Sequence, residues 1–322
     1  MPTRTTFAPI TLSDIEAAQA RIAPYVRRTP LSRSDTLSRR LGTNVYLKAE
    51  VFQKTGAFKV RGAFNKMLSI PDDARGHGVV AMSGGNHAQA VAYAARALGM
   101  RALIFMPKST PANYVDATRG YGAEVSFTET SLDGFAAMED YATKGWVAVH
   151  PFNDPLVMAG QGTAGLEIVE DVPQVTDVVV SIGGGGLIAG IATAVKERHP
   201  KARVWGVETE GADCMARALA ANEVVTMRAV TSIARTLGAP AASPETLAAV
   251  QRYVESVTVV SDADALAAMR FLLERTKMLV EPAGSCTLTA AERLQDKFGP
   301  NAHVVLFLCG GNISVEDLCR LA

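Results

Sequence analysis

The 322-residue sequence is poor in cysteine and has no net charge. Its four cysteines, Cys214, Cys286, Cys309 and Cys319, form no C-x-x-C pair and no metal-ligand spacing, so we expect reduced thiols in a cytoplasmic protein. The 32 basic and 32 acidic side chains balance, which gives no electrostatic basis for binding nucleic acid or a membrane. The N-terminal stretch MPTRTTFAPITLSDIEAAQ lacks the apolar run of a signal peptide.

One uncharged run, VVVSIGGGGLIAGIATAV from Val178 to Val195, is long enough to suggest a membrane span. Four consecutive glycines at its centre argue against a continuous helix, because each costs about 1 kcal/mol relative to alanine. The run instead predicts a buried strand, a glycine loop and an apolar helix.

Short apolar runs alternate with helical stretches along the chain, which predicts an α/β fold with parallel, doubly wound sheets. The spacing of Ser13 and Glu16 predicts a capping box at the start of a first helix. The predicted strands are Val45–Leu47, Val79–Met82, Ala102–Met106, Glu124–Phe127, Val147–Val149, Val178–Ile182, Val204–Val207, Val257–Val260 and Val304–Leu308. The predicted helices include His87–Leu98, Ser131–Ala142, Ala159–Val169, Leu187–Glu197 and Asp262–Arg275.

Three glycine-rich turns each follow a predicted strand, at 83–87, 183–186 and 309–312. Glycines let a backbone approach an anion closely, and the free N–H groups of a following helix point at it. Three such turns favour a bound anion over simple tight turns. A nicotinamide cofactor or ATP is disfavoured, because the chain has neither G-x-G-x-x-G followed by a strand-end acid nor a Walker-type lysine.

Five ordered motifs, KTGAFKVRGA, SGGNHAQ, GGGG, VEPAG and LCGGN, resemble those of the fold-type II pyridoxal-phosphate enzymes. The resemblance is to the serine/threonine dehydratase (ammonia-lyase) family, including phenylserine-dehydratase-like members, and extends from about Thr29 to Leu318. It implies two open, doubly wound parallel sheets, with pyridoxal 5'-phosphate in the cleft between a large domain (1–78 and 147–322) and a small domain (79–146). It also implies a homodimer.

The resemblance assigns the cofactor contacts residue by residue. Lys59, crowded between Phe58 and Val60, would hold the cofactor through a Schiff base, and poor solvation would lower its pKa toward the nucleophilic, unprotonated state. The remaining cofactor contacts that it implies are Phe58 beside the lysine, Gly183, Gly184, Gly185 and Gly186 around the phosphate, Asn86 at the pyridine 3'-oxygen, Gly238 and Glu281 along the pocket, and Cys309 at the pyridine nitrogen.

The substrate contacts follow from the same resemblance. Ser83, counted with Lys59 as catalytic, would clamp the substrate carboxylate together with the backbone of Gly84, Gly85, Asn86 and His87. Phe152 would lie beside the substrate side chain.

Two positions depart from the family pattern. Racemases of the family have a serine where this chain has Gly84, so racemisation is disfavoured. Several relatives bind a divalent cation through a glutamate, a carbonyl and an aspartate; Glu208 and Ala212 match, but Cys214 stands in the aspartate position. Because magnesium and calcium prefer oxygen ligands, a thiol there weakens the site, and we assign no metal to it.

We therefore expect β-elimination of an L-β-hydroxy-α-amino acid, such as L-threonine or L-serine, to a 2-oxo acid and ammonium. One alternative is a bulkier substrate such as phenylserine, which the apolar Phe152 would suit. Another is β-replacement, although those relatives usually carry threonine at the position of His87. A nicotinamide dehydrogenase and a catalytically silent cofactor-binding protein are the alternatives from other classes.

Overall fold

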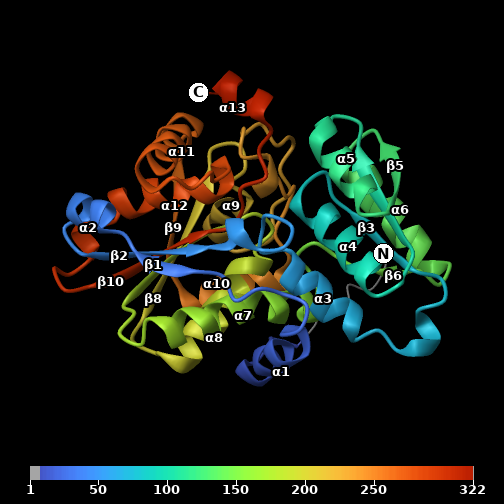
Figure 1. Cartoon of the computed structure of the whole chain (residues 1–322), viewed down its shortest axis with the longest axis horizontal. Coiled ribbons are helices and arrows are strands. Elements are labelled where there is room, and N and C mark those ends of the chain that lie inside the picture. Colours follow the sequence, from blue (N-terminus) through green and yellow to red (C-terminus); the bar gives the residue numbers. More distant parts are fainter. Residues whose placement is uncertain (1–7, 322) are drawn as a thin grey trace.

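Two β-sheets form separate α/β units that lie side by side (Figure 1). The computed structural model describes residues 8–321. The larger sheet has the strand order β1-β2-β10-β7-β8-β9, and the smaller sheet has the order β5-β4-β3-β6. The strands are β1 (Leu31–Arg33), β2 (Asn44–Ala49), β3 (Val79–Met82), β4 (Ala102–Pro107), β5 (Glu124–Thr128), β6 (Val147–Ala148), β7 (Asp177–Ser181), β8 (Arg203–Thr209), β9 (Val254–Val260) and β10 (His303–Leu308).

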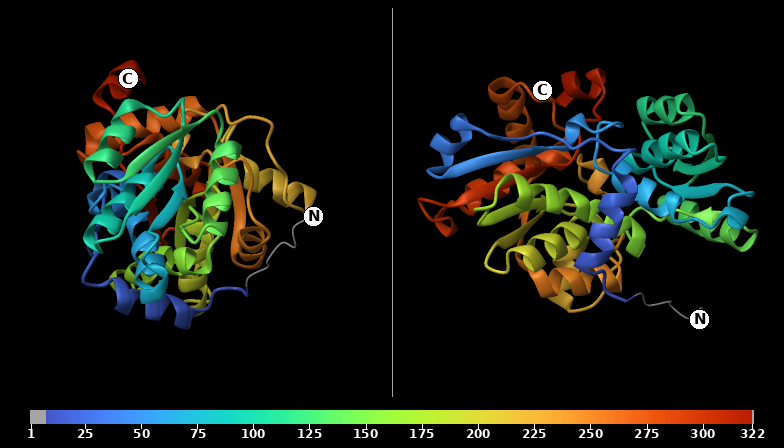
Figure 2. Two further views of the ribbon diagram at one scale, coloured as in Figure 1. Left: turned by 90° about the vertical axis from the view of Figure 1, so that its right-hand side faces the viewer. Right: turned by 60° about the horizontal axis from the view of Figure 1, so that its bottom comes forward.

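Helices cover both faces of the larger sheet, with α7 and α8 on one side and α11 and α12 on the other (Figure 1). Helix α1 lies against α3 and α7 (Figure 2). The helices are α1 (Leu12–Ile22), α2 (Asp35–Leu41), α3 (Val60–Leu68), α4 (Asn86–Ala97), α5 (Ala112–Gly120), α6 (Ser131–Thr143), α7 (Pro155–Asp171), α8 (Gly186–Arg198), α9 (Cys214–Ala221), α10 (Pro244–Tyr253), α11 (Asp262–Thr276), α12 (Pro282–Arg293) and α13 (Val315–Leu321).

The α/β prediction is confirmed, with one exception to the parallel pairing. Strand β1 runs antiparallel to β2, so the larger sheet is mixed at that edge. This strand has three residues, two of which are exposed, so it lacks the apolar run by which the other strands are found.

Two sequence-based boundaries are wrong. Helix α1 is capped by Thr11, which shares a capping box with Asp14, whereas Ser13 lies inside the helix. The predicted small domain ended at residue 146, but β6 pairs with β3 and therefore belongs to the smaller sheet. The division into domains otherwise stays a prediction.

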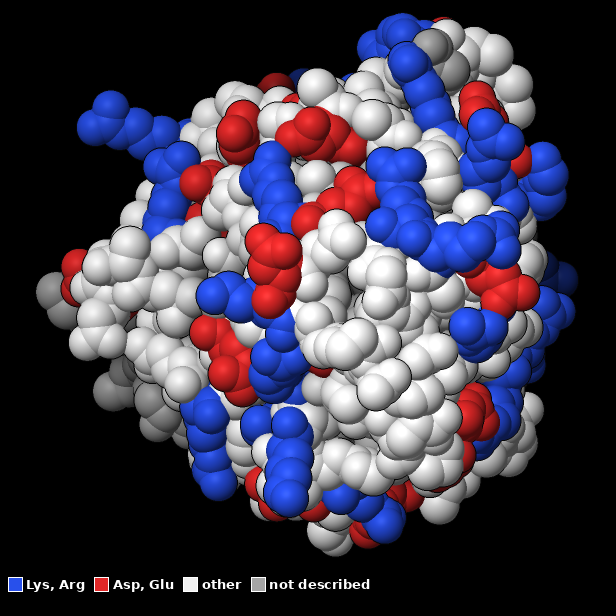
Figure 3. Space-filling model, turned by 90° about the vertical axis from the view of Figure 1, so that its left-hand side faces the viewer, with Lys and Arg blue, Asp and Glu red and all other residues white. Residues whose placement is uncertain are grey.

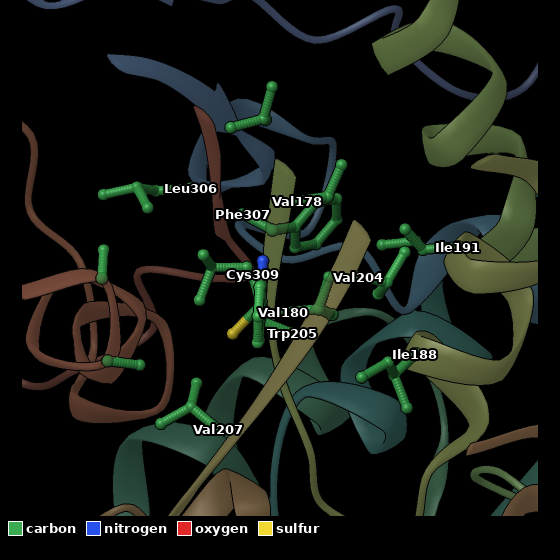
Figure 4. Close-up of a cluster of buried hydrophobic side chains, with 14 of the residues drawn as sticks. Val178, Val180, Ile188, Ile191, Val204, Trp205, Val207, Leu306, Phe307 and Cys309 are labelled. Carbon is green, nitrogen blue, oxygen red and sulfur yellow. The ribbon is translucent and has the colours of Figure 1, made fainter. Parts of the chain in front are cut away.

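Each sheet has its own apolar core. Figure 4 shows part of the larger core, where Val178, Val180 and Val204 from neighbouring strands face the helix α8 side chain Ile188, and Leu306 lies on the other side of the sheet. In the smaller unit, α3 and α4 pack against β3 and β4. Between residues 8 and 321 no helix is long and apolar enough to cross a membrane. On the face shown in Figure 3, Lys and Arg side chains lie among Asp and Glu side chains.

Candidate active site

A cavity of about 550 Å³ opens between the two units. Its walls include the segments that follow strands β3, β7 and β10, together with the stretch 230–240. All three glycine-rich turns of the sequence therefore contribute to one cavity, at the carboxyl ends of parallel strands where α/β proteins bind their ligands.

Lys59 lies on the cavity wall at the N-cap position of α3. Its Nζ atom donates a hydrogen bond of 2.8 Å to the carbonyl oxygen of Pro151 and lies 5.2 Å from the centre of the Phe58 ring. Burial lowers the pKa of Lys59 to about 8, against the opposing influence of Cys309 and Glu281. The amine can therefore become an unprotonated nucleophile close to neutral pH.

This pKa predicts how the apoprotein takes up an aldehyde. We expect the rate of recombination with pyridoxal 5'-phosphate to rise with pH and to reach half its maximum near pH 8, because only the unprotonated amine of Lys59 attacks a carbonyl carbon. Stopped-flow absorbance at a series of pH values measures it. A midpoint near the ordinary lysine pKa of about 10.4 would contradict it.

The glycine loop 183–186 connects β7 to α8 and has no room for side chains. A Cβ atom on Gly184 would lie 2.3 Å from the Phe152 ring, and one on Gly186 would lie 2.8 Å from the backbone of Phe152. Gly185 has a φ of 94°, in the left-handed region that favours glycine. No side chain caps the N-terminus of α8, so its first N–H groups are available to an anion.

The glycine-rich turn 83–87 brings Ser83 to the N-terminus of α4. Ser83 Oγ accepts a hydrogen bond of 3.1 Å from the backbone N–H of Gly85, and no side chain caps α4. Ser83, Gly84, Gly85, Asn86 and His87 all line the cavity. This turn is thus a second set of backbone donors suited to a carboxylate or phosphate.

Asn86 and Glu281 are hydrogen-bonded to each other across the cavity wall. Glu281 Oε1 accepts from Asn86 Nδ2 at 2.7 Å and from Thr236 Oγ1 at 2.9 Å, while Asn312 Nδ2 donates to Asn86 Oδ1 at 2.8 Å. Burial raises the pKa of Glu281 to about 7, although these donors oppose it. Its second oxygen is buried without a partner among the described residues, so it remains available to a ligand.

Cys309 lies at the end of β10, among apolar side chains (Figure 4). Burial raises the pKa of its thiol well above the ordinary value, so the group is neutral at physiological pH. Its carbonyl oxygen accepts a hydrogen bond from the N–H of Phe58, which ties this strand end to the segment that carries Lys59.

His87 and Phe152 both line the cavity. His87 is buried, and its Nε2 hydrogen-bonds the carbonyl oxygen of Val149 at 2.8 Å. Burial lowers the pKa of His87 to about 3, so the ring is neutral. The Phe152 ring packs over the glycine loop and against His150, with ring centres 4.7 Å apart.

The three positions considered for a cation are arranged around a helix terminus. Glu208 accepts hydrogen bonds from the N–H groups of Met215 and Ala216 in the first turn of α9, and the Cys214 thiol donates to the carbonyl oxygen of Gly183. Ala212 pairs with Thr209 in an isolated bridge. The described part of the chain holds no group of three His, Cys, Asp or Glu side chains that could bind a metal.

Several residues that line the cavity were not predicted from the sequence. Thr236 donates to Glu281, and Phe135 of α6 stacks on His150 with ring centres 5.2 Å apart. Thr110, which follows β4, also lines the cavity. None of these side chains stands in a glycine-rich turn, so only the tertiary contacts identify them.

These features fit a ligand that has both a phosphate and a polar aromatic ring. The uncapped terminus of α8 suits the phosphate, the neutral thiol of Cys309 and the unpartnered oxygen of Glu281 suit ring atoms, and Lys59 supplies an amine. The predicted site residues therefore share one cavity, except Glu208, Ala212 and Cys214, which do not line it. Their individual roles stay predictions.

Comparison with known proteins identifies the family. Residues 22–310 match the family described as pyridoxal-phosphate dependent enzyme. The chain is 44% identical over 308 residues to an L-threonine ammonia-lyase of Geobacter sulfurreducens, covering 94% of this chain and 76% of the relative. Its fold is similar to maize serine racemase (TM-score 0.92, 35% identity, 97% of each chain) and to a threonine deaminase from T.th. (TM-score 0.88, 40% identity, 94% of this chain and 99% of the other). Because the family match covers most of the chain, this protein belongs to the pyridoxal-phosphate dependent enzymes of fold-type II.

Proposed function

We propose that the protein eliminates water from L-threonine or L-serine and releases a 2-oxo acid and ammonium. The observation that carries the proposal is the position of Lys59, whose amine lies on the wall of a cavity that also contains two uncapped helix N-termini. One terminus suits the cofactor phosphate and the other suits the substrate carboxylate. The relatives named L-threonine ammonia-lyase support the choice of substrate.

Each residue has a role that its geometry supports. The backbone donors after Ser83 would orient the substrate carboxylate, and the amine of Lys59 would accept the Cα proton. When bound, the cofactor supplies the electron-withdrawing ring that makes a bond at Cα labile. A neutral Cys309 thiol at the ring nitrogen would not hold a positive charge there, which favours rapid loss of a β-substituent over transamination.

A bulkier β-hydroxy amino acid is the second candidate substrate. Phe135 and Phe152 both line the cavity, and the His150 ring behind them stacks on Phe135 and meets Phe152 edge to face; such an aromatic surface suits an aryl group. Phenylserine would make that contact, whereas threonine would leave most of it unused.

The experiment compares release of 2-oxo acid from L-threonine, L-serine and L-threo-phenylserine by the purified holoenzyme. The proposal predicts turnover of at least one of them, and the ratio of kcat/KM values ranks the two candidate substrate classes. Turnover of O-acetylserine with sulfide, without 2-oxo acid from any β-hydroxy amino acid, would establish β-replacement instead. The predicted homodimer and cytoplasmic location stay predictions.

A further inference from the structure

The space beside Gly84 is occupied, although this residue has no side chain. A Cβ atom on Gly84 would lie 2.6 Å from Thr110 Oγ1, and 3.5 Å from both Thr110 Cγ2 and Pro107 Cδ. A separation of 2.6 Å is closer than two such atoms can approach without displacement. The hydroxyl of Thr110 therefore stands where a side chain on residue 84 would be.

This hydroxyl is free to act on a ligand. Thr110 Oγ1 is buried and has no hydrogen-bond partner among residues 8–321, and Thr110 lines the cavity. Buried hydroxyls nearly always have a partner, so a partnerless one at a ligand cavity suggests that the partner is the ligand.

The sheet order places Thr110 and Lys59 on opposite sides of the turn 83–87. In the smaller sheet β3 lies between β4 and β6, with adjacent strands about 4.8 Å apart. Thr110 follows β4, the turn follows β3, and Lys59 is hydrogen-bonded to Pro151, which follows β6. A substrate whose carboxylate lies on the turn would thus have the Lys59 amine on one side and the Thr110 hydroxyl on the other.

We propose that Thr110 is a second proton-transfer residue and that the enzyme inverts L-amino acids at Cα besides eliminating water. This rests on the proposed function for the position of the substrate carboxylate. Lys59 Nζ takes the Cα proton, and the electron pair of the broken C–H bond stays with the substrate. The Thr110 O–H bond then breaks as its proton forms a new C–H bond on the opposite side. Water returns a proton to the Thr110 oxygen and removes one from Lys59, so no oxidant is needed.

The glycine at position 84 by itself disfavours racemisation, because it has no group that transfers a proton. The structure supplies the hydroxyl from position 110, which is 26 residues further along the chain and on a different strand end. The proton transfer that Gly84 cannot perform is therefore available to the Thr110 hydroxyl beside it.

A thermal melting cycle tests the geometry without measuring activity. We expect Gly84→Ala to lower the Tm by about 2–4 °C because the new methyl group meets Thr110. Combining it with Thr110→Ala should restore most of that loss, since neighbouring sites are not additive. Additive shifts would show that the two side chains do not share this space, and would overturn the proposal.

The second experiment incubates the holoenzyme with L-threonine in D₂O. Inversion at Cα gives D-allothreonine, a diastereomer that an achiral column separates, and 2-oxobutanoate is measured in the same sample. We expect wild-type protein to form D-allothreonine with deuterium at Cα. Thr110→Val, which keeps the shape but lacks the hydroxyl, should lower the ratio of D-allothreonine to 2-oxobutanoate by about 100-fold.

Matched variants complete the test. Thr110→Ser should retain most of the ratio, and Thr143→Val, which removes an exposed threonine hydroxyl outside the cavity, should leave it unchanged. Absence of D-allothreonine from wild-type samples that release 2-oxobutanoate would overturn this inference alone, as would an unchanged ratio in Thr110→Val. D-allothreonine without 2-oxobutanoate would support inversion and overturn the proposed elimination.

Discussion

Replacement of Lys59 by alanine is expected to lower the release of 2-oxo acid by at least about 10³-fold, because the variant lacks the amine that we propose as both the covalent anchor for the cofactor and the base at Cα. The fold should be retained, since the Lys59 amine makes one hydrogen bond, to the carbonyl oxygen of Pro151. Steady-state assays with L-threonine measure the loss. Borohydride reduction of the wild-type holoenzyme, followed by peptide mapping, should place the phosphopyridoxyl group on Lys59.

Lys54 provides the control for this experiment. It lies five residues earlier and does not line the cavity, so Lys54→Ala should retain turnover and cofactor labelling. A phosphopyridoxyl group on any lysine other than Lys59 would contradict the assignment. So would a Lys59→Ala variant with wild-type turnover.

Replacement of Arg61 is expected to cause the second large effect, a loss of stability. This buried guanidinium donates to Glu50 at 2.8 and 2.9 Å and to Glu167 at 2.7 and 2.9 Å, and Lys48 also donates to Glu167. Removing one partner of a buried ion pair leaves an uncompensated charge, which costs about 3–5 kcal/mol. Arg61→Leu should therefore lower the free energy of unfolding by about that amount, measured by urea denaturation.

An exposed ion pair on the same molecule serves as the comparison. Arg28 pairs with Glu170, and the side chains are 50% and 46% exposed. Arg28→Ala should change the free energy of unfolding by about 1 kcal/mol or less, because solvent screens such pairs. If Arg61→Leu does not yield soluble protein, Glu50→Gln tests the same network by removing one charge. Equal, small effects of the buried and exposed substitutions would contradict the expected cost.

The Arg61 network also bears on the site, because Arg61 lies two residues after Lys59 on α3. Its partners come from the segment Glu50–Phe52 and from α7, so the network ties the start of α3 to the larger unit. The network therefore holds the helix start that carries Lys59.

Much of the fold and the centre of the site followed from local sequence. The apolar runs at Val178–Ile182 and Val304–Leu308 predicted buried strands because a strand covered on both faces needs no polar alternation. Lys59 and the glycine loop 183–186 were predicted because they belong to short contiguous motifs that resemble those of the family, and small side chains in these motifs permit close backbone approach. The antiparallel strand β1 and the cap of α1 were not predicted correctly, since both depend on one or two residues of ambiguous pattern.

The tertiary structure alone decided which distant side chains meet. Glu281 binds Asn86 and Thr236, from 195 and 45 residues away, and Thr110 fills the space beside Gly84. Periodicity and motif spacing carry no information on such contacts, because they depend on the order of strands in the sheet and on how the two units face each other. The sequence by itself therefore determined the family and its cofactor class, whereas the folded chain decided which hydroxyl lies beside Gly84.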